Sequence, residues 1–496
     1  MKRVVLTAVM VVLVGSAVAV WAQPRPAPTA PVTPVVRPVV IPITKPLTRK
    51  GLQRALRKVY AGTVAKDGMF TIHVKEAGGA VIFSRKARTK LHPASCVKLV
   101  TSTAALRSLG AKHKFKTLLR GKISGATMTT PLYLWGDGDP SLSRDDLKQL
   151  AAAIKSKGVT AIPQGIVVDD SYFDGRRWAP GFMRTAGSAY SAPSGAVSMD
   201  HNTVEVEVTP TTMGQPASVK LLPPSAYLHE LFTVRTGKRT TWWGYAAPFK
   251  RGVRVLVRGR IQAGIGPRRR FFRVLHPARY AGESFKRMLE DEGIKVGPAK
   301  RGLLPATPPP ELHRHESAEL SELLRRMNRH SNNFYAEQLV KALGAKESNP
   351  PGSTKKGLKA LRSTLEWVGA GRWSYALANG SGLGGNTKLS ARLLVRLLDK
   401  IGKAPALHKV IYDSLARPAE PGTLKRLKNT IAIGRMRAKT GTIKQVSCLA
   451  GYVDGKPGKK PLIFAIVHNG FTASILKIRD QQTKIVEALV RYSFNR

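Results

Sequence analysis

The secondary-structure signal changes twice along this chain, and this change constrains the fold more than any other feature. Strands and helices alternate near both ends, whereas residues 118–274 show runs of alternating apolar and polar residues such as Val204–Val208. Such alternation is typical of half-buried strands. We therefore predict an α/β (α+β) fold in which one domain is interrupted by a β-rich insert of one or two small domains.

The expected boundaries follow from the same signal. The first part of the interrupted domain is residues 47–117, the insert is residues 118–274, and the second part is residues 275–496. Helices outside the insert are expected at residues 50–60, 97–109, within 317–405, and at 474–492. Strands outside the insert are expected at residues 70–74, 80–83, 436–443, 447–453 and 462–468.

The first residues predict export. Met1–Arg3 is cationic, and an uncharged, valine-rich run over residues 4–22 ends in small residues. This arrangement is typical of a signal peptide, which we place at residues 1–22. An uncleaved anchor is the alternative, because the run is just long enough to span a bilayer. We expect the folded chain in the periplasm or on the cell-wall side of the membrane, behind a proline-rich tether over residues 23–46.

The net charge is strongly positive, with 82 Lys+Arg against 30 Asp+Glu, or +52. Such an excess usually indicates nucleic acid. An exported protein does not meet cytoplasmic DNA, so we exclude nucleic acid and expect anionic cell-envelope polymers as partners. The basic run Arg268–Arg270 is accordingly interpreted as a solvated loop or a wall-facing patch. A hydrophobic content of 43% is that of a folded protein rather than a disordered polycation.

The two cysteines, Cys96 and Cys448, are too few for a disulfide scaffold or a cysteine-based zinc site. A single disulfide between them stays possible in an oxidising compartment. The histidines show no metal-ligand pattern, and Asp169-Asp170 is interpreted as a turn or surface pair. We expect no metal and no organic cofactor.

Three short motifs carry the chemistry, and the first is Ser95-x-x-Lys98 at the start of a predicted helix. A serine hydroxyl needs a neighbouring base to act as a nucleophile, and a spacing of three places Lys98 on the same helix face as Ser95. The helix N-terminus also favours the negative charge that develops during attack. Lys98 must be partly neutral to accept a proton, which burial or a nearby cation promotes.

The second and third motifs lie far downstream. The Ser-Asn-Asn run Ser331–Asn333 starts a helical segment, and the Lys-Thr-Gly-Thr run Lys439–Thr442 lies on a predicted strand. A lysine with two threonine hydroxyls suits an anionic carboxylate, and the glycine would let a substrate backbone approach the strand. Considered one at a time, the motifs have simpler interpretations, in which Ser95 is a helix N-cap and Lys439 is an exposed strand lysine. The order of the three motifs favours the catalytic interpretation.

The sequence resembles the class C low-molecular-mass penicillin-binding proteins, which are D-alanyl-D-alanine carboxypeptidases and endopeptidases that trim peptidoglycan. The resemblance extends from about residue 50 to the C-terminus, and it implies a penicillin-binding/β-lactamase-like transpeptidase domain with domains inserted between Ser95 and Ser331. Asn332 and Asn379 depart from the pattern, because the family more often has Asp at these positions. Further segments that match it are Gly136–Pro140, Asp169–Phe173, Tyr335–Glu337, Gly380–Leu383, Gly422–Leu424 and Arg437–Thr442.

The resemblance implies a role for each motif residue. Ser95 is the expected nucleophile, Lys98 its base, and Ser331 a proton relay to the leaving group. Asn333 would hold the substrate amide, and a carboxylate-binding strand would supply the remaining substrate-binding residues, which are Lys439, Thr440, Gly441 and Thr442.

The implied function is that of an exported serine DD-peptidase that cleaves the D-Ala-D-Ala ends, and also D-Ala cross-links, of peptidoglycan stem peptides through a Ser95 acyl-enzyme. β-Lactam antibiotics would acylate the same serine. Two alternatives stay open. A serine β-lactamase would need a deacylating base that we do not locate in the sequence, and a catalytically idle wall-binding module would keep only the fold.

Overall fold

The structure is a computed structural model that describes residues 41–182 and 188–495. The signal peptide expected at residues 1–22 lies outside the described residues, as does most of the tether expected at residues 23–46. Within the described ranges, no helix has both the length and the apolar character needed to cross a membrane.

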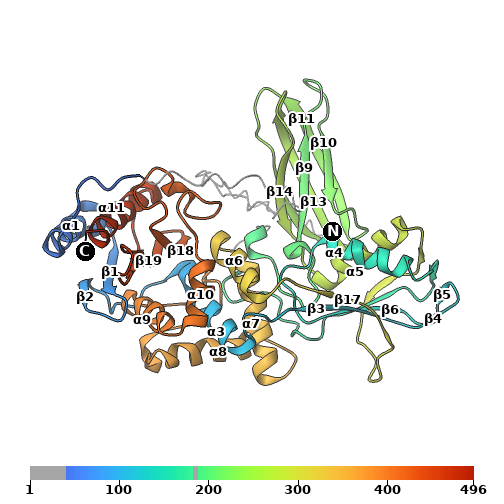
Figure 1. Ribbon diagram of the computed structural model, residues 1–496. Helices are drawn as coiled ribbons and strands as arrows, with labels where there is room; N and C mark the ends of the chain where they lie inside the picture. The colour runs from blue at the N-terminus through green and yellow to red at the C-terminus, as the bar shows by residue number, and fades with distance from the viewer. Residues whose placement is uncertain (1–40, 183–187, 496) are drawn as a thin grey trace, which may run out of the picture. The chain divides into compact units, whose positions relative to one another are not determined.

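A five-stranded antiparallel sheet joins the two ends of the chain (Figure 1). The first strand along the chain, β1 (Met69–Glu76), pairs with the last strand, β20 (Leu462–Asn469), so that neither end completes the sheet alone. The remaining strands are β2 (Val81–Arg85), β18 (Met436–Ile443) and β19 (Val446–Val453), in the order β18-β19-β20-β1-β2. This arrangement confirms the strands predicted outside the insert.

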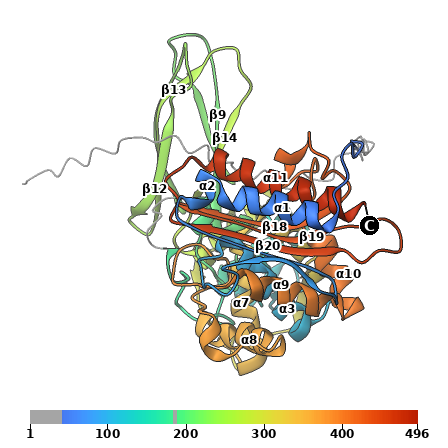
Figure 2. The same ribbon diagram turned by 90° about the vertical axis from the view of Figure 1, so that its left-hand side faces the viewer.

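The central strand shows why helices cover both faces of this sheet. Along β20, Ile463, Ala465 and Val467 belong to one apolar cluster, and the alternate residues Phe464 and Ile466 belong to another. Successive side chains of a strand point to opposite faces, so an uninterrupted apolar strand needs cover on both. Figure 2 shows α1 (Arg49–Ala61) and α11 (Ile475–Ser493) on one side, and the helices that carry the site on the other.

The helices of the second layer come mainly from the chain after the insert. They are α3 (Lys98–Leu109), α6 (Leu320–His330), α7 (Asn333–Ser348), α8 (Thr354–Trp367), α9 (Ala391–Gly402) and α10 (Pro405–Ser414). These bounds confirm the helices predicted at 97–109 and within 317–405. A short helix, α2 (Thr63–Lys66), follows α1.

The insert contains sheets and helices around a separate apolar core. A five-stranded sheet has the order β16-β8-β6-β3-β17, with β3 (Lys116–Arg120), β6 (Leu132–Gly136), β8 (Ile166–Asp169), β16 (Ala299–Arg301) and β17 (Glu311–Glu316). A smaller sheet contains β4 (Ile123–Ser124), β5 (Thr127–Met128), β7 (Ala161–Ile162) and β15 (Lys295–Val296). Two helices belong to this part, α4 (Arg144–Lys155) and α5 (Pro277–Asp291).

Two three-stranded sheets complete the insert (Figure 1). One has the order β10-β9-β14, with β9 (Thr203–Thr209), β10 (Ser218–Leu222) and β14 (Arg268–Arg273). The other has the order β11-β13-β12, with β11 (Leu228–Gly237), β12 (Trp243–Phe249) and β13 (Gly252–Gln262). The basic run Arg268–Arg270 therefore lies on a strand, and its interpretation as a loop is wrong, because these residues pair with Val206–Val208 of β9.

The strand pairing also bears on where the insert ends. β17 is antiparallel to β3, and β16 is parallel to β8, so residues as late as Glu316 complete an inserted sheet. We propose that the insert extends to about residue 316, beyond the boundary at 274 expected from the sequence. Local periodicity does not reveal that the chain returns to the insert after residue 274. A strand joins a sheet by pairing with another strand, which can be distant in the sequence.

Candidate active site

Ser95 lies on a 3₁₀ turn, η1 (Ala94–Val97), that leads directly into α3. The preceding residue, Ala94, has a left-handed backbone with φ 44°. Such conformations cost free energy and persist where surrounding packing imposes them. The N-cap of α3 is Val97, so the alternative in which Ser95 merely caps this helix is wrong.

Lys98 makes three hydrogen bonds from a fully buried position. Its Nζ lies 2.9 Å from Ser95 Oγ, 2.7 Å from Asn333 Oδ1 and 2.8 Å from the carbonyl oxygen of Ser381. The amide and carbonyl oxygens only accept hydrogen bonds, whereas the hydroxyl of Ser95 also donates. A neutral amine has two N–H groups and one lone pair. In its neutral form Lys98 can donate both N–H groups to the two acceptors and keep its lone pair for the proton of Ser95.

The electrostatic surroundings favour the same protonation state. Burial, together with the nearby ammonium group of Lys439, lowers the pKa of Lys98 well below its ordinary value. Burial disfavours the charged form of an amine, and a like charge nearby disfavours it further. Burial and a nearby cation, the two conditions expected from the sequence to favour a neutral Lys98, are therefore both present.

Asn333 is oriented by a partner from the insert. Its Nδ2 donates to the carbonyl oxygen of Tyr190 at 3.1 Å, which turns Oδ1 toward Lys98. Tyr190 lies on the short turn η3 (Ala189–Ser191), and its side chain is exposed. Because a carbonyl cannot donate a hydrogen bond, this contact fixes which end of the amide faces the lysine.

Ser331 and Lys439 form a second pair beside the first. The Nζ of Lys439 donates to Ser331 Oγ at 2.9 Å and to the carbonyl oxygen of Thr440 at 2.7 Å. Ser331 ends α6 with a left-handed backbone, φ 59°. Lys439 is fully buried, so the alternative of an exposed strand lysine is wrong, and burial lowers its pKa to about 8.

Gly441 lets η1, the turn that carries Ser95, pack closely against β18. A Cβ at this position would lie 2.6 Å from the carbonyl oxygen of Pro93 and 2.9 Å from the backbone nitrogen of Ser95. No side chain fits at such distances, so the glycine is required by η1 itself. The sequence explained Gly441 by a substrate backbone, whereas this contact within the protein already demands it.

The other strand residues predicted to bind substrate lie close by. Thr440 is half-buried and Thr442 is exposed, and both follow Lys439 along β18. β18 is the edge strand of the sheet, next to η1. The structure thus brings together Ser95, Lys98, Ser331, Asn333, Lys439, Thr440, Gly441 and Thr442.

One polar ridge of α7 is formed by Asn333, Glu337 and Lys341, and sequence reasoning assigned a role only to the first of these. The carboxylate of buried Glu337 accepts from the backbone nitrogen of Ser381 at 2.8 Å and thereby fixes the carbonyl that Lys98 contacts. Lys341 reaches into the insert, where its Nζ lies 2.7 Å from Asp174 Oδ1. Polar residues spaced by four on an otherwise buried helix were the available signal.

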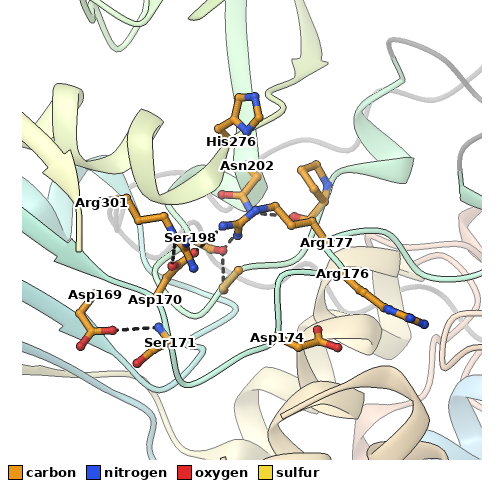
Figure 3. Close-up of polar contacts among 12 residues, drawn as sticks. Asp169, Asp170, Ser171, Asp174, Arg176, Arg177, Ser198, Asn202, His276 and Arg301 are labelled. Carbon is orange, nitrogen blue, oxygen red and sulfur yellow. Dashed lines mark hydrogen bonds and ion pairs between the residues drawn. The ribbon is translucent and has the colours of Figure 1, made fainter. Parts of the chain in front are cut away.

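The segment that Lys341 contacts begins in a buried polar cluster (Figure 3). Asp170 forms ion pairs with Arg177 at 2.8 Å and with Arg301 at 2.6 Å, and Asp169 accepts from the backbone nitrogen of Ser171 at 2.9 Å. Both aspartates are buried, so their interpretation as a surface pair is wrong. The arginines neutralise a carboxylate that could not otherwise be buried at low cost.

Cys96 and Cys448 are buried free thiols. The Sγ of Cys96 lies 3.3 Å from the carbonyl oxygen of Lys439, which places this side chain between η1 and β18. The disulfide that the sequence left possible is absent between these two described residues.

Comparisons with known proteins place this geometry in a family. The sequence matches the D-Ala-D-Ala carboxypeptidase 3 (S13) family over residues 54–492. It is 35% identical over 418 residues to a D-alanyl-D-alanine carboxypeptidase of Actinomadura sp. (strain R39), which covers 80% of this chain and 77% of that protein. It is 26% identical over 419 residues to the D-alanyl-D-alanine carboxypeptidase DacB of Haemophilus influenzae, covering 82% and 86%.

A solved structure shows the same fold. The crystal structure of penicillin binding protein 4 (dacB) from Haemophilus influenzae superposes with a TM-score of 0.73 at 24% identity, covering 89% of this chain and 98% of that one. The fold is therefore the penicillin-binding/β-lactamase-like fold with extra β-rich domains, as predicted. With the family match over nearly the whole folded region, the chain belongs to the S13 family of D-Ala-D-Ala carboxypeptidases.

Proposed function

We propose that the protein is an exported serine DD-peptidase in which Ser95 forms an acyl-enzyme with D-Ala-D-Ala peptides. One observation carries the proposal, the contact of buried Lys98 with both Ser95 Oγ and Asn333 Oδ1. A lysine in that position can act as the base that accepts the proton of the serine hydroxyl. The S13 family supplies the reaction class, which is that of a D-Ala-D-Ala carboxypeptidase.

The acylation step uses the neutral form of Lys98. Its lone pair takes the proton of Ser95 as Oγ attacks the carbonyl carbon of the penultimate D-Ala, giving a tetrahedral intermediate. Ser331, hydrogen-bonded to Lys439, donates its hydroxyl proton to the departing amine and takes up the proton that Lys98 received from Ser95, so that Lys98 is neutral again. The C–N bond then breaks, D-Ala leaves, and water later hydrolyses the ester on Ser95.

Substrate binding follows from the position of β18 at the sheet edge. An extended peptide adds to such an edge as a further strand. Its terminal carboxylate would meet charged Lys439 with Thr440 and Thr442, and Asn333 Nδ2 would exchange the carbonyl of Tyr190 for the substrate amide. The backbone N–H groups of Ser95 and Thr442 would stabilise the oxyanion.

The same site is proposed to accept D-Ala cross-links and β-lactams. A cross-link differs only in the group that leaves after D-Ala, and a β-lactam presents a strained amide beside a carboxylate. One crystal structure of the Haemophilus influenzae penicillin binding protein 4 is complexed with a β-lactam. For this chain the prediction is a stable penicilloyl ester on Ser95.

Incubation with a labelled penicillin tests the proposal, with the Ser95→Ala variant as control. A lasting label on the wild type that the variant lacks supports the DD-peptidase. Rapid loss of label with hydrolysis of the drug would indicate a β-lactamase, and an unlabelled wild type would leave only an idle wall-binding module. Release of D-Ala from a pentapeptide, compared with cleavage of a purified cross-linked dimer, measures the balance of the two activities.

Export is tested separately. The signal peptide proposed at residues 1–22 predicts that the secreted protein begins at Gln23. N-terminal sequencing of protein from the envelope fraction checks this, and an intact Met1 there would indicate the uncleaved anchor.

A further inference from the structure

The sheet β11-β13-β12 has one face packed on the insert core and one face turned outward. Along β13 the inner face carries Val253, Val255 and Val257, which belong to the insert's apolar core. Alternate residues lie on the opposite face, as the side-chain period of two requires. The outward set along β13 is Arg254, Leu256, Arg258 and Arg260.

Strand register places aromatic rings beside this row. Trp243 is paired with Arg258, and Tyr245 with Leu256. The two side chains are 49% and 45% exposed, and their rings are nearly parallel, with an interplanar angle of 14° and centroids 6.1 Å apart. Large rings are normally buried, and an exposed pair on one sheet face indicates a binding surface.

The third strand extends the same face. Leu231 on β11 is paired with Leu256, and Arg235 with Arg260. The outward face therefore carries an apolar row of Leu231, Leu256 and Tyr245, followed by a row in which Trp243 lies beside Arg258 and by a row of two arginines, Arg235 and Arg260. We call this set the aromatic-arginine face; its members are Leu231, Arg235, Trp243, Tyr245, Arg254, Leu256, Arg258 and Arg260.

A cationic pocket of 330 Å³ adjoins one end of the face. His229, whose partner on β13 is Arg254, is part of its lining together with Lys250, Arg251 and Arg279. One acid, Glu283, contributes to the same lining. A pocket with this excess of positive charge fits a carboxylate.

We propose that the aromatic-arginine face binds a carboxylate-bearing glycan strand of the cell wall. The C–H groups on one side of a pyranose ring form an apolar surface that packs on an aromatic ring. Guanidinium groups bind carboxylates through paired hydrogen bonds. This inference rests on the proposed function, because the insert would bind the same polymer whose peptides the active site cleaves.

The order of side chains favours a glycan over a lipid surface. Arg258 lies directly beside Trp243, and Leu256 between Leu231 and Tyr245 is only 7% exposed. A membrane-inserting face would present a continuous apolar tip to the hydrocarbon region. Rings and guanidinium groups in adjacent rows instead match a polymer of sugar rings with interspersed carboxylates.

Cosedimentation with purified sacculi, and with glycan strands stripped of their peptides, tests the proposal in the full chain. The test variants are Trp243→Ala/Tyr245→Ala and Arg258→Ser/Arg260→Ser. Matched controls are Trp373→Ala, which removes a Trp that is 83% exposed on another segment, and Arg57→Ser/Lys58→Ser on α1. Labelled penicillin is applied to every variant to show that the active site is intact.

We expect each test variant to raise the half-saturation concentration about tenfold, with the controls at the wild-type value. The arginine variant should also flatten the dependence on salt, because its charges are those that salt screens. Test variants that bind like the controls would overturn the proposal, as would a loss of binding to anionic phospholipid vesicles with binding to sacculi unchanged. A wild type that binds glycan through this face but takes no label would contradict the proposed function alone.

Discussion

The active site and the outward face of the insert use positive charge in opposite ways. In the site, Lys98 and Lys439 are fully buried and carry lowered pKa values, so that their protonation state is adjustable. On the insert face, Arg258 and Arg260 are exposed on a strand beside aromatic rings. An amine loses its charge readily when buried, whereas a guanidinium group stays charged at every relevant pH. Proton transfer requires the first property, and holding an anionic polymer requires the second.

Exchanging lysine and arginine between the two regions tests this comparison most directly and has the largest expected effect. Lys98→Arg keeps the positive charge but cannot become neutral, so we expect acylation by labelled penicillin to fall about 10³-fold. Arg258→Lys on the insert is the matched control and should acylate like the wild type. A Lys98→Arg protein that acylates at the wild-type rate would show that Lys98 is not the base.

Close packing in the site predicts the next largest effect. Gly441→Ala places a Cβ within 2.6 Å of the carbonyl oxygen of Pro93 and 2.9 Å of Ser95 N, which displaces η1 and Ser95 with it. We expect acylation to fall about 10²-fold, as small displacements of a reacting group do. Gly402→Ala at the end of α9 has open space around its Cβ and is the control. Equal rates for the two variants would contradict the role given to Gly441.

The pH dependence of acylation separates the two lysines. Above about pH 8 Lys439 loses its proton and its attraction for a carboxylate, so the second-order rate constant should fall about tenfold for each further pH unit. Toward low pH the rate should fall again as Lys98 becomes protonated. Lys439→Arg should lose the alkaline decrease, and a wild-type rate that stays constant well above pH 8 would contradict this assignment.

The cysteines give the smallest expected effect. Because both are free, protein purified without reductant should titrate as two thiols after denaturation. Added reductant should leave the melting temperature unchanged, since there is no cross-link to remove. A drop of several degrees on reduction would reveal a disulfide between Cys96 and Cys448.

Much of the fold was predictable because the local periodicity of apolar residues identifies most of its helices and strands. The uninterrupted apolar run of β20 and the spacing of Leu52 and Leu56 on α1 identify these elements without knowledge of their partners. The helix α4 within the insert was missed, although Ser143 and Asp146 form a capping box at its start. β17 was not assigned to the insert, because its pairing with β3 joins residues far apart in the sequence.

The sequence by itself determined the order of Ser95, Ser331 and Lys439, and with it the chemistry that these side chains can perform. Only the tertiary structure decided that Lys98 has two obligate acceptors and one hydroxyl as partners, and that Glu337 fixes one of those acceptors. It also brought Trp243 beside Arg258. The physical reason is the same in each case: residue type is local, whereas burial, hydrogen-bond partners and neighbouring charges are supplied by segments distant along the chain.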